Sequence, residues 1–131
     1  MATVRPDATI ATVVRLLKLE GIGALVVSTD GSKVQGIISE RDVVRGLAEH
    51  GAALLEMPVS SLMTRVVKTC RLDAPITDVM AEMTRSRFRH LPVVEDGQLR
   101  GIVSIGDVVK NRLEELETET HVLRDFIVGR S

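Results

Sequence analysis

Apolar residues recur at the spacing of an α-helix in two stretches of the chain, 66 residues apart. The positions are Ile10, Val13, Val14 and Leu17 in the first stretch, and Ile76, Val79, Met80 and Met83 in the second. A helix that buries one face shows this i, i+3, i+4, i+7 pattern. Two equivalent helices are therefore predicted. Thr9 or Asp7 suits the cap of the first helix and Gly21 its end, and Pro75 suits the opening turn of the second.

Short runs rich in β-branched residues flank each predicted helix and indicate strands. The predicted strands are residues 3–4, 24–28 and 34–38 in the first stretch, and 66–70, 91–95 and 99–103 in the second. Asp-Gly pairs at 30–31 and 96–97 predict the turns between the last two strands of each stretch. A further helix begins near Ser39 or Ser104. Each stretch is thus predicted to form a βαββα unit.

One nine-residue segment occurs twice, which identifies the two stretches as copies of one unit. Gly36 to Val44 and Gly101 to Val109 are identical at six of nine positions, at an offset of 65. Upstream the offset is 66, because the first turn holds one extra residue, Ser32 or a neighbour. A unit of roughly 60 residues buries too little surface to be stable alone. We therefore expect an α/β (α+β) fold in which two βαββα repeats pack around a pseudo-twofold axis.

A long C-terminal helix is predicted beyond the second repeat. From Val109 onward, positions compatible with an apolar seam alternate by four and three residues: Leu113, Leu116, Thr120, Leu123 and Ile127. This alternation is typical of packing between helices, either from two subunits or within one domain. The predicted boundaries are repeat 1 at 1–50, a connector at 51–62, repeat 2 at 63–112 and a helical tail at 113–131.

Composition limits the classes of function. The formal net charge is −1 and aromatic residues make up 2% of the chain, so binding to nucleic acid is not expected. Apolar runs are too short for a membrane span. The single Cys70 cannot form an intrachain disulfide, which fits a reducing cytoplasm. Because the chain carries no recognisable nucleophile–base, zinc or phosphate-loop motif, we expect neither enzymatic activity nor a metal requirement.

A Ser-x-x-Asp motif follows the third predicted strand in both copies, at Ser39–Asp42 and Ser104–Asp107. Structurally, it fits a capping box, in which the hydroxyl accepts a first-turn amide and the carboxylate reaches back to the serine backbone. Functionally, it suits a nucleotide, because helix amides attract phosphate and the carboxylate can accept both ribose hydroxyl groups. The residues alone favour neither role, since capping and binding are compatible.

Two further segments, Leu62 to Thr69 (LMTRVVKT) and His90 to Gly97 (HLPVVEDG), occur in order with these motifs. Together with Gly36 to Asp42 they resemble the CBS domain, which is named after cystathionine β-synthase and occurs in pairs called Bateman modules. The resemblance spans nearly the whole chain. It implies a regulatory module that binds AMP, ADP or ATP, or sometimes S-adenosylmethionine or NAD, in clefts between the repeats. AMP is the ligand that we expect first.

The resemblance also implies roles for individual residues. The motif aspartate holds the ribose, and the motif serine lies near the ribose or phosphate. The segment before the first helix contacts adenine, largely through its backbone, and the basic pair before the Leu-Pro-Val strand approaches phosphates. The implied nucleotide-binding residues are Ser39, Arg41, Asp42, Thr64, Arg65, Val66, Arg89, His90, Pro92, Ser104 and Asp107.

The two copies differ at positions that matter for such a site. The basic pair at 89–90 aligns with Gly-Ala at 23–24, so repeat 1 lacks it. An equivalent of 63–65 is missing before repeat 1, and the pocket of this repeat is expected to be incomplete. Arg41 stands where repeat 2 has Gly106, and we expect it to help neutralise phosphates. The site of repeat 2 is therefore expected to be occupied more readily.

Two functions from different classes fit these observations. The first is a sensor, in which nucleotide occupancy changes the cleft or a dimer and an unidentified regulated protein reads the change. The alternative is a structural dimerisation or interaction module without a physiological ligand, in which Ser-x-x-Asp only caps helices. In both, the resemblance implies a homodimer formed by the repeats, with the C-terminal helix as a second contact.

Overall fold

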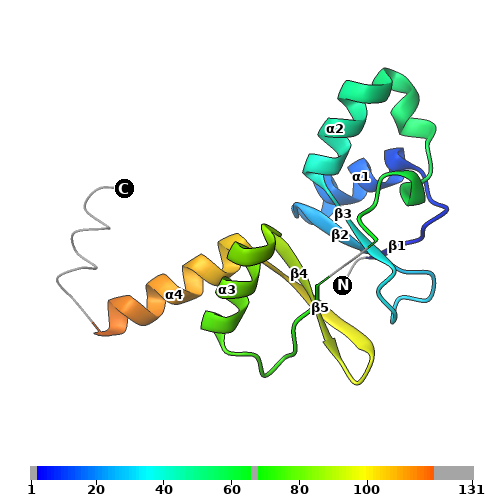
Figure 1. The fold of residues 1–131 in the computed structure, drawn as a ribbon. Helices are drawn as coiled ribbons and strands as arrows, with labels where there is room; N and C mark the ends of the chain where they lie inside the picture. Colours follow the sequence, from blue (N-terminus) through cyan, green and yellow to red (C-terminus); the bar gives the residue numbers. More distant parts are fainter. Residues whose placement is uncertain (1–2, 66–67, 120–131) are drawn as a thin grey trace. The chain divides into compact units, whose positions relative to one another are not determined.

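The computed structural model describes residues 3–65 and 68–119 of the 131-residue chain. Figure 1 shows the succession of its elements. They are β1 (Thr3–Val4), α1 (Ile10–Glu20), β2 (Ala24–Val27), β3 (Gly36–Ser39), α2 (Glu40–His50), the 3-10 helices η1 (Gly51–Glu56) and η2 (Val59–Ser61), α3 (Ile76–Ser86), β4 (His90–Glu95), β5 (Gln98–Ser104) and α4 (Ile105–Glu119). The predicted α+β class is confirmed.

Among the described residues, 3–65, 68–72 and 91–102 belong to one compact unit, and residues 73–90 with 103–119 belong to a second. The first unit contains a three-stranded sheet of order β1-β2-β3, in which β1 pairs with β2 in parallel and β2 with β3 in antiparallel register. All four residues of the central strand β2 are buried. Such a continuous apolar run is expected of a strand that is covered on both faces.

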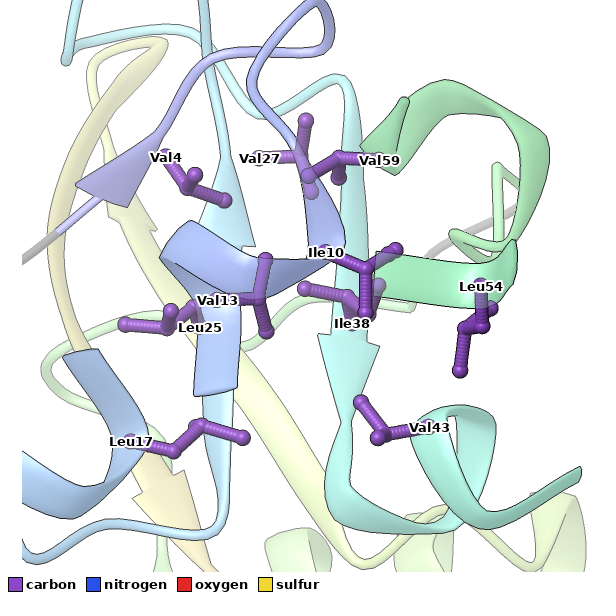
Figure 2. Packing of buried hydrophobic residues seen from close by; sticks show 10 residues of the cluster. All are labelled: Val4, Ile10, Val13, Leu17, Leu25, Val27, Ile38, Val43, Leu54 and Val59. Atoms are coloured by element: carbon purple, nitrogen blue, oxygen red, sulfur yellow. The ribbon is translucent and has the colours of Figure 1, made fainter. Parts of the chain in front are cut away.

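The core of this unit lies around α1 and the sheet. Its buried side chains are Val4, Ile10, Val13, Leu17, Leu25, Val27, Ile38, Val43, Leu54 and Val59. Figure 2 shows these ten side chains and the helices and strands that carry them. The apolar stripe predicted for the first helix is confirmed at Ile10, Val13 and Leu17, whereas Val14 remains 40% exposed. The buried face of α1 is therefore narrower than the sequence pattern suggested.

Strands β4 and β5 form a separate two-stranded sheet that repeats the geometry of the first. The Val94 amide donates to the Cys70 carbonyl (2.8 Å), as the Ser28 amide donates to the Val4 carbonyl (2.8 Å) 66 residues earlier. Cys70 thus forms a parallel bridge with Val93. Of the strand predicted at 66–70, the described residues 68–70 form only this bridge, and residues 66–67 lie outside the described part.

The predicted ends of the first helix are confirmed. The Thr12 amide donates to the Thr9 hydroxyl (3.3 Å), and Gly21 ends α1 in the left-handed conformation at φ 64°. Pro75 immediately precedes α3 rather than opening its first turn. The residue that ends α3 in the same left-handed conformation is Arg87, at φ 59°. Arg87 aligns with Gly21, so the second copy adopts a backbone conformation that costs little only for glycine.

The turns between the last two strands differ between the copies. Asp96 and Gly97 both have positive φ, as expected of a tight hairpin turn. In the longer first turn, the Asp30 carboxylate accepts the amides of Ser32 (2.9 Å) and Lys33 (3.0 Å). These bonds favour the charged carboxylate, so the pKa of Asp30 is held well below its ordinary value. The strands on either side of this turn pair over residues 24–27 and 36–39, so the strand predicted at 34–38 begins only at Gly36.

The predicted connector contributes to the core of the first unit. It folds into η1 and η2, and Leu54 and Val59 on these helices are 0% exposed. Gly46 of α2 makes room for Leu54 and Leu62, because a Cβ atom at this position would lie 2.6 Å from Leu54 Cδ1 and 2.5 Å from Leu62 Cδ2. The segment after residue 50 is thus part of the packing of the first copy.

The predicted C-terminal helix is confirmed as far as Glu119, where α4 ends in the described part of the chain. Leu113 is 37% exposed and Leu116 is half-buried. The remaining seam positions, Thr120, Leu123 and Ile127, lie outside the described residues. Packing of the repeats around a pseudo-twofold axis, and the boundaries of the repeats and tail, stay predictions.

The role of the connector can be tested with adjacent leucines. We expect Leu54→Ala to lower the free energy of unfolding by about 2–5 kcal/mol, because it leaves a cavity among buried side chains. Leu55→Ala is the control, since Leu55 is 42% exposed, and its effect should stay within about 0.5 kcal/mol. Urea unfolding followed by circular dichroism measures both. Equal losses in the two variants would contradict a core role for η1.

Replacement of the left-handed residue Arg87 after α3 by glycine should stabilise the protein. We expect Arg87→Gly to raise the free energy of unfolding by about 1 kcal/mol, because glycine adopts φ 59° without a clash of its side chain. The matched variant Gly21→Ala should lower it by a similar amount, since a Cβ atom there contacts nothing but still disfavours φ 64°. Thermal unfolding measures both changes. An unchanged or lower stability of Arg87→Gly would contradict strain at this position.

Candidate functional site

The Ser-x-x-Asp motif of the first copy forms the junction between β3 and α2. Ser39 is the last residue of β3 and caps α2, and its hydroxyl accepts the Asp42 amide (3.4 Å). The Asp42 carboxylate reaches back through Oδ2 to the Ser39 amide (2.9 Å) and hydroxyl (3.1 Å). The predicted capping box is therefore confirmed in this copy. It places a hydroxyl and a carboxylate at the positive end of a helix dipole.

The second copy builds the same box between β5 and α4. The Ser104 hydroxyl accepts the Asp107 amide (3.1 Å), and Asp107 Oδ2 accepts the Ser104 amide (3.2 Å). Asp107 is exposed, whereas Asp42 is half-buried. In both copies the bonds of the box use Oδ2, and Oδ1 takes no part in it. Each carboxylate can therefore keep its helix capped and still accept a hydroxyl group from a ligand.

A backbone hydrogen bond brings Arg89 to the box of the second copy. The Ile105 amide, the first of α4, donates to the Arg89 carbonyl (2.7 Å). The equivalent bond in the first copy joins the Glu40 amide to the Gly23 carbonyl (3.0 Å). Gly23 has no side chain, whereas Arg89 adds an exposed guanidinium at this position. A cation and a helix N-terminus close together form a site suited to an anion.

His90 and Pro92 occupy β4, next to Arg89 in the chain. His90 is half-buried, while Pro92 is almost completely buried and its carbonyl accepts the Cys70 amide (3.0 Å). Pro92 thus helps to hold β4 beside the chain at Cys70. Burial raises the pKa of the Cys70 thiol, so this residue is mainly in the unreactive thiol form at neutral pH.

Thr64 and Arg65 lie in the first unit, beside β3. The Thr64 amide donates to the Ile37 carbonyl (2.9 Å), and the Ile37 amide donates to the Thr64 carbonyl (3.0 Å). Arg65 is exposed and donates to the Ser60 carbonyl (3.3 Å). The pairing sets Thr64 beside the strand that leads into Ser39, although the predicted boundaries assign Thr64 to the second copy. Sequence reasoning missed this contact, because no side-chain pattern marks it.

The remaining predicted site residues are placed less fully. Arg41 is exposed on the first turn of α2, between Ser39 and Asp42. Val66 lies outside the described residues. Within residues 3–65 and 68–119, no group of three or more His, Cys, Asp or Glu side chains could hold a metal ion. The helices of the same residues are all too short or too polar to cross a membrane.

Comparison with known proteins identifies the family. The CBS domain family matches residues 1–49 and 59–114, so the chain belongs to the CBS domain family. It is 38% identical over 112 residues to an uncharacterised 17.7 kDa protein of Acidianus ambivalens. It is 35% identical over 127 residues to the mitochondrial CBS domain-containing protein CBSX3 of Arabidopsis thaliana. The matches cover 85% and 94% of this chain, but only 66% and 62% of those proteins.

Solved structures confirm the CBS-pair fold. The CBS-domain protein ATU1752 of Agrobacterium tumefaciens is 47% identical with a TM-score of 0.80, over 86% of this chain and 89% of that one. The CBS domain pair of protein MJ0100 is 25% identical with a TM-score of 0.74, over 82% of this chain and 89% of that one. It was solved in complex with 5′-methylthioadenosine and S-adenosyl-L-methionine. A CBS-domain pair is the class that fold and family define, and no enzyme family is indicated.

Proposed function

We propose that this protein is a non-catalytic sensor that binds an adenine nucleotide, with AMP as the first ligand to test, and signals to a partner. One observation carries the proposal: the Ile105–Arg89 backbone bond fixes the backbone of an arginine at the start of α4, where the Ser104–Asp107 box forms. Serine hydroxyl, carboxylate and guanidinium are the groups that recognise phosphate and ribose. The adenosine compounds bound by the MJ0100 pair support the adenine part.

The two copies are expected to bind the nucleotide with unequal affinity. Both boxes offer Oδ1 of an aspartate for ribose hydroxyl groups, but only the second copy has an arginine before its second strand. Phosphates would therefore favour the second copy. Arg41 is exposed on the first turn of α2, and its predicted role in neutralising phosphates stays a prediction. The cleft between the repeats, a cytoplasmic location and the identity of the regulated partner stay predictions.

The alternative, a structural module without a ligand, explains the capping boxes equally well, because each box is complete without a nucleotide. It gives no role to the exposed Arg89 beside the second box. Nucleotide binding gives this side chain a function, so we favour the sensor. A ligand can act as a signal only if it binds two conformations of the protein with different affinity.

An aspartate-to-asparagine pair tests the sensor. Asparagine can still accept the Ser104 amide through its carbonyl oxygen, but its amide group cannot accept a ribose hydroxyl. We therefore expect Asp107→Asn to weaken AMP binding at least tenfold, with unfolding stability changed by less than about 1 kcal/mol. Asp42→Asn, at the equivalent box, should weaken it less. Isothermal titration calorimetry measures affinity, and thermal unfolding checks the fold.

The same experiment separates the two functions. Stabilisation of the protein by AMP, ADP, ATP, NAD or S-adenosylmethionine in thermal unfolding would support a ligand site, because a ligand that binds only the folded state raises stability. Absence of stabilisation by all five would favour the structural module. Equal losses in Asp42→Asn and Asp107→Asn would contradict unequal sites.

We also propose that the protein forms a homodimer through its helices. Val44 of α2 and Val109 of α4 occupy equivalent positions in the two copies and are 64% and 44% exposed. Leu47 and Leu113 on the same helices are 46% and 37% exposed. The matching valines, together with one further exposed leucine on each helix, support an interface in which each helix faces a helix of the second subunit.

A charge at these positions should separate the subunits. We expect Val44→Glu together with Val109→Glu to shift the molar mass in light scattering from dimer to monomer, because the interface would bury unpaired carboxylates. Asn111→Glu is the control, since it adds the same charge at an exposed polar position of α4. A monomeric parent protein, or a double variant that remains dimeric, would contradict the proposal.

A further inference from the structure

The glycine that opens the repeated segment is in contact with a neighbouring chain segment in the first copy. Gly36 is buried, and a Cβ atom added there would lie 2.8 Å from the Thr64 carbonyl oxygen and 2.9 Å from Met63 Sδ. The adjacent Ile37 exchanges both of its backbone hydrogen bonds with Thr64. Met63–Thr64 is thus an extended segment added to the edge of β3, with its methionine placed over a glycine.

The equivalent glycine in the second copy has no such neighbour. Gly101 is half-buried, and nothing in the described part of the chain lies within 4 Å of a Cβ atom built on it. Among these residues, Ile102 has no bridge partner other than the hairpin strand β4. Nearer the turn, the Leu99 amide donates to the Ser32 carbonyl (2.7 Å), so the open stretch begins after Leu99.

Burial shows the same difference along the two strands. Gly36 and Ile38 of β3 are buried, whereas their equivalents Gly101 and Val103 of β5 are only half-buried. Strand β5 therefore keeps accessible apolar surface and an open edge where β3 is covered. Open strand edges pair readily with extended peptides, because their backbone amides and carbonyls have no partner.

We propose that the edge of β5 at Gly101–Ile102 binds an extended peptide segment of a partner protein by strand addition. The first copy shows the chemistry of the occupant. A long unbranched apolar residue, such as methionine, lies over Gly101, and the next residue pairs its backbone with Ile102. Met63–Thr64 of the same chain is already paired with Ile37, so a second copy of the protein offers no free segment of this kind in the described residues.

A peptide copied from the chain tests the proposal. The probe is the capped hexapeptide SSLMTR, the sequence of residues 60–65, titrated into the ¹⁵N-labelled full-length protein. We expect the largest amide shifts at Gly101, Ile102 and Val103. Gly101→Ala should weaken binding at least tenfold, because its methyl group occupies the space of the methionine. The free protein tolerates this methyl group, since nothing lies near it.

Two controls keep the test decisive. The peptide SSLDTR should bind at least tenfold more weakly, because a carboxylate would replace the apolar side chain over Gly101. Circular dichroism of Gly101→Ala confirms that the variant is folded. Unchanged affinity in Gly101→Ala, or shifts confined to residues outside β5, would overturn the proposal. AMP binding by the parent protein is measured separately. A failure of peptide binding at β5 can therefore be distinguished from a failure of AMP binding.

Discussion

One backbone hydrogen bond, present in both halves of the chain, determines where each site can form. The first amide of the helix donates to the carbonyl just before the second strand, from Glu40 to Gly23 and from Ile105 to Arg89. The second and third strands are also paired with each other. The bond therefore fixes the start of the helix at the open end of the hairpin, where the second strand begins and the third strand ends. The Ser–Asp box then forms at a defined place.

Local chemistry explains why much of this could be predicted from the sequence. The cap at Thr9 and both boxes follow from side chains that bond to backbone within four residues, and the end at Gly21 follows from a residue that adopts positive φ at little cost. The segment at 51–62 was less predictable, because 3-10 helices are too short to show a periodic apolar pattern. The pairing of Thr64 with Ile37 was not predictable at all, since backbone hydrogen bonds between distant segments do not depend on side-chain identity.

The two copies show that a shared backbone can carry different chemistry. The hydrogen bonds that set the helix starts are the same in both, yet Gly23 in one copy corresponds to Arg89 in the other. At the ends of α1 and α3, Gly21 corresponds to Arg87 although both adopt a left-handed conformation. The second copy has thus gained cations around β4, in one case at a cost in backbone conformation. Such a pattern is expected when one copy specialises and the other maintains the scaffold.

The burial of Leu54 and Val59 also bears on how such proteins can recombine. Repeat boundaries suggest that a gene segment ending at residue 50 encodes a transferable half. In the folded chain, that segment lacks two side chains of its own core. It also lacks Thr64, which covers the edge of β3. A chimera that exchanges the first half with a relative should therefore keep residues up to 65 with it, so the unit of exchange is longer than the unit of duplication.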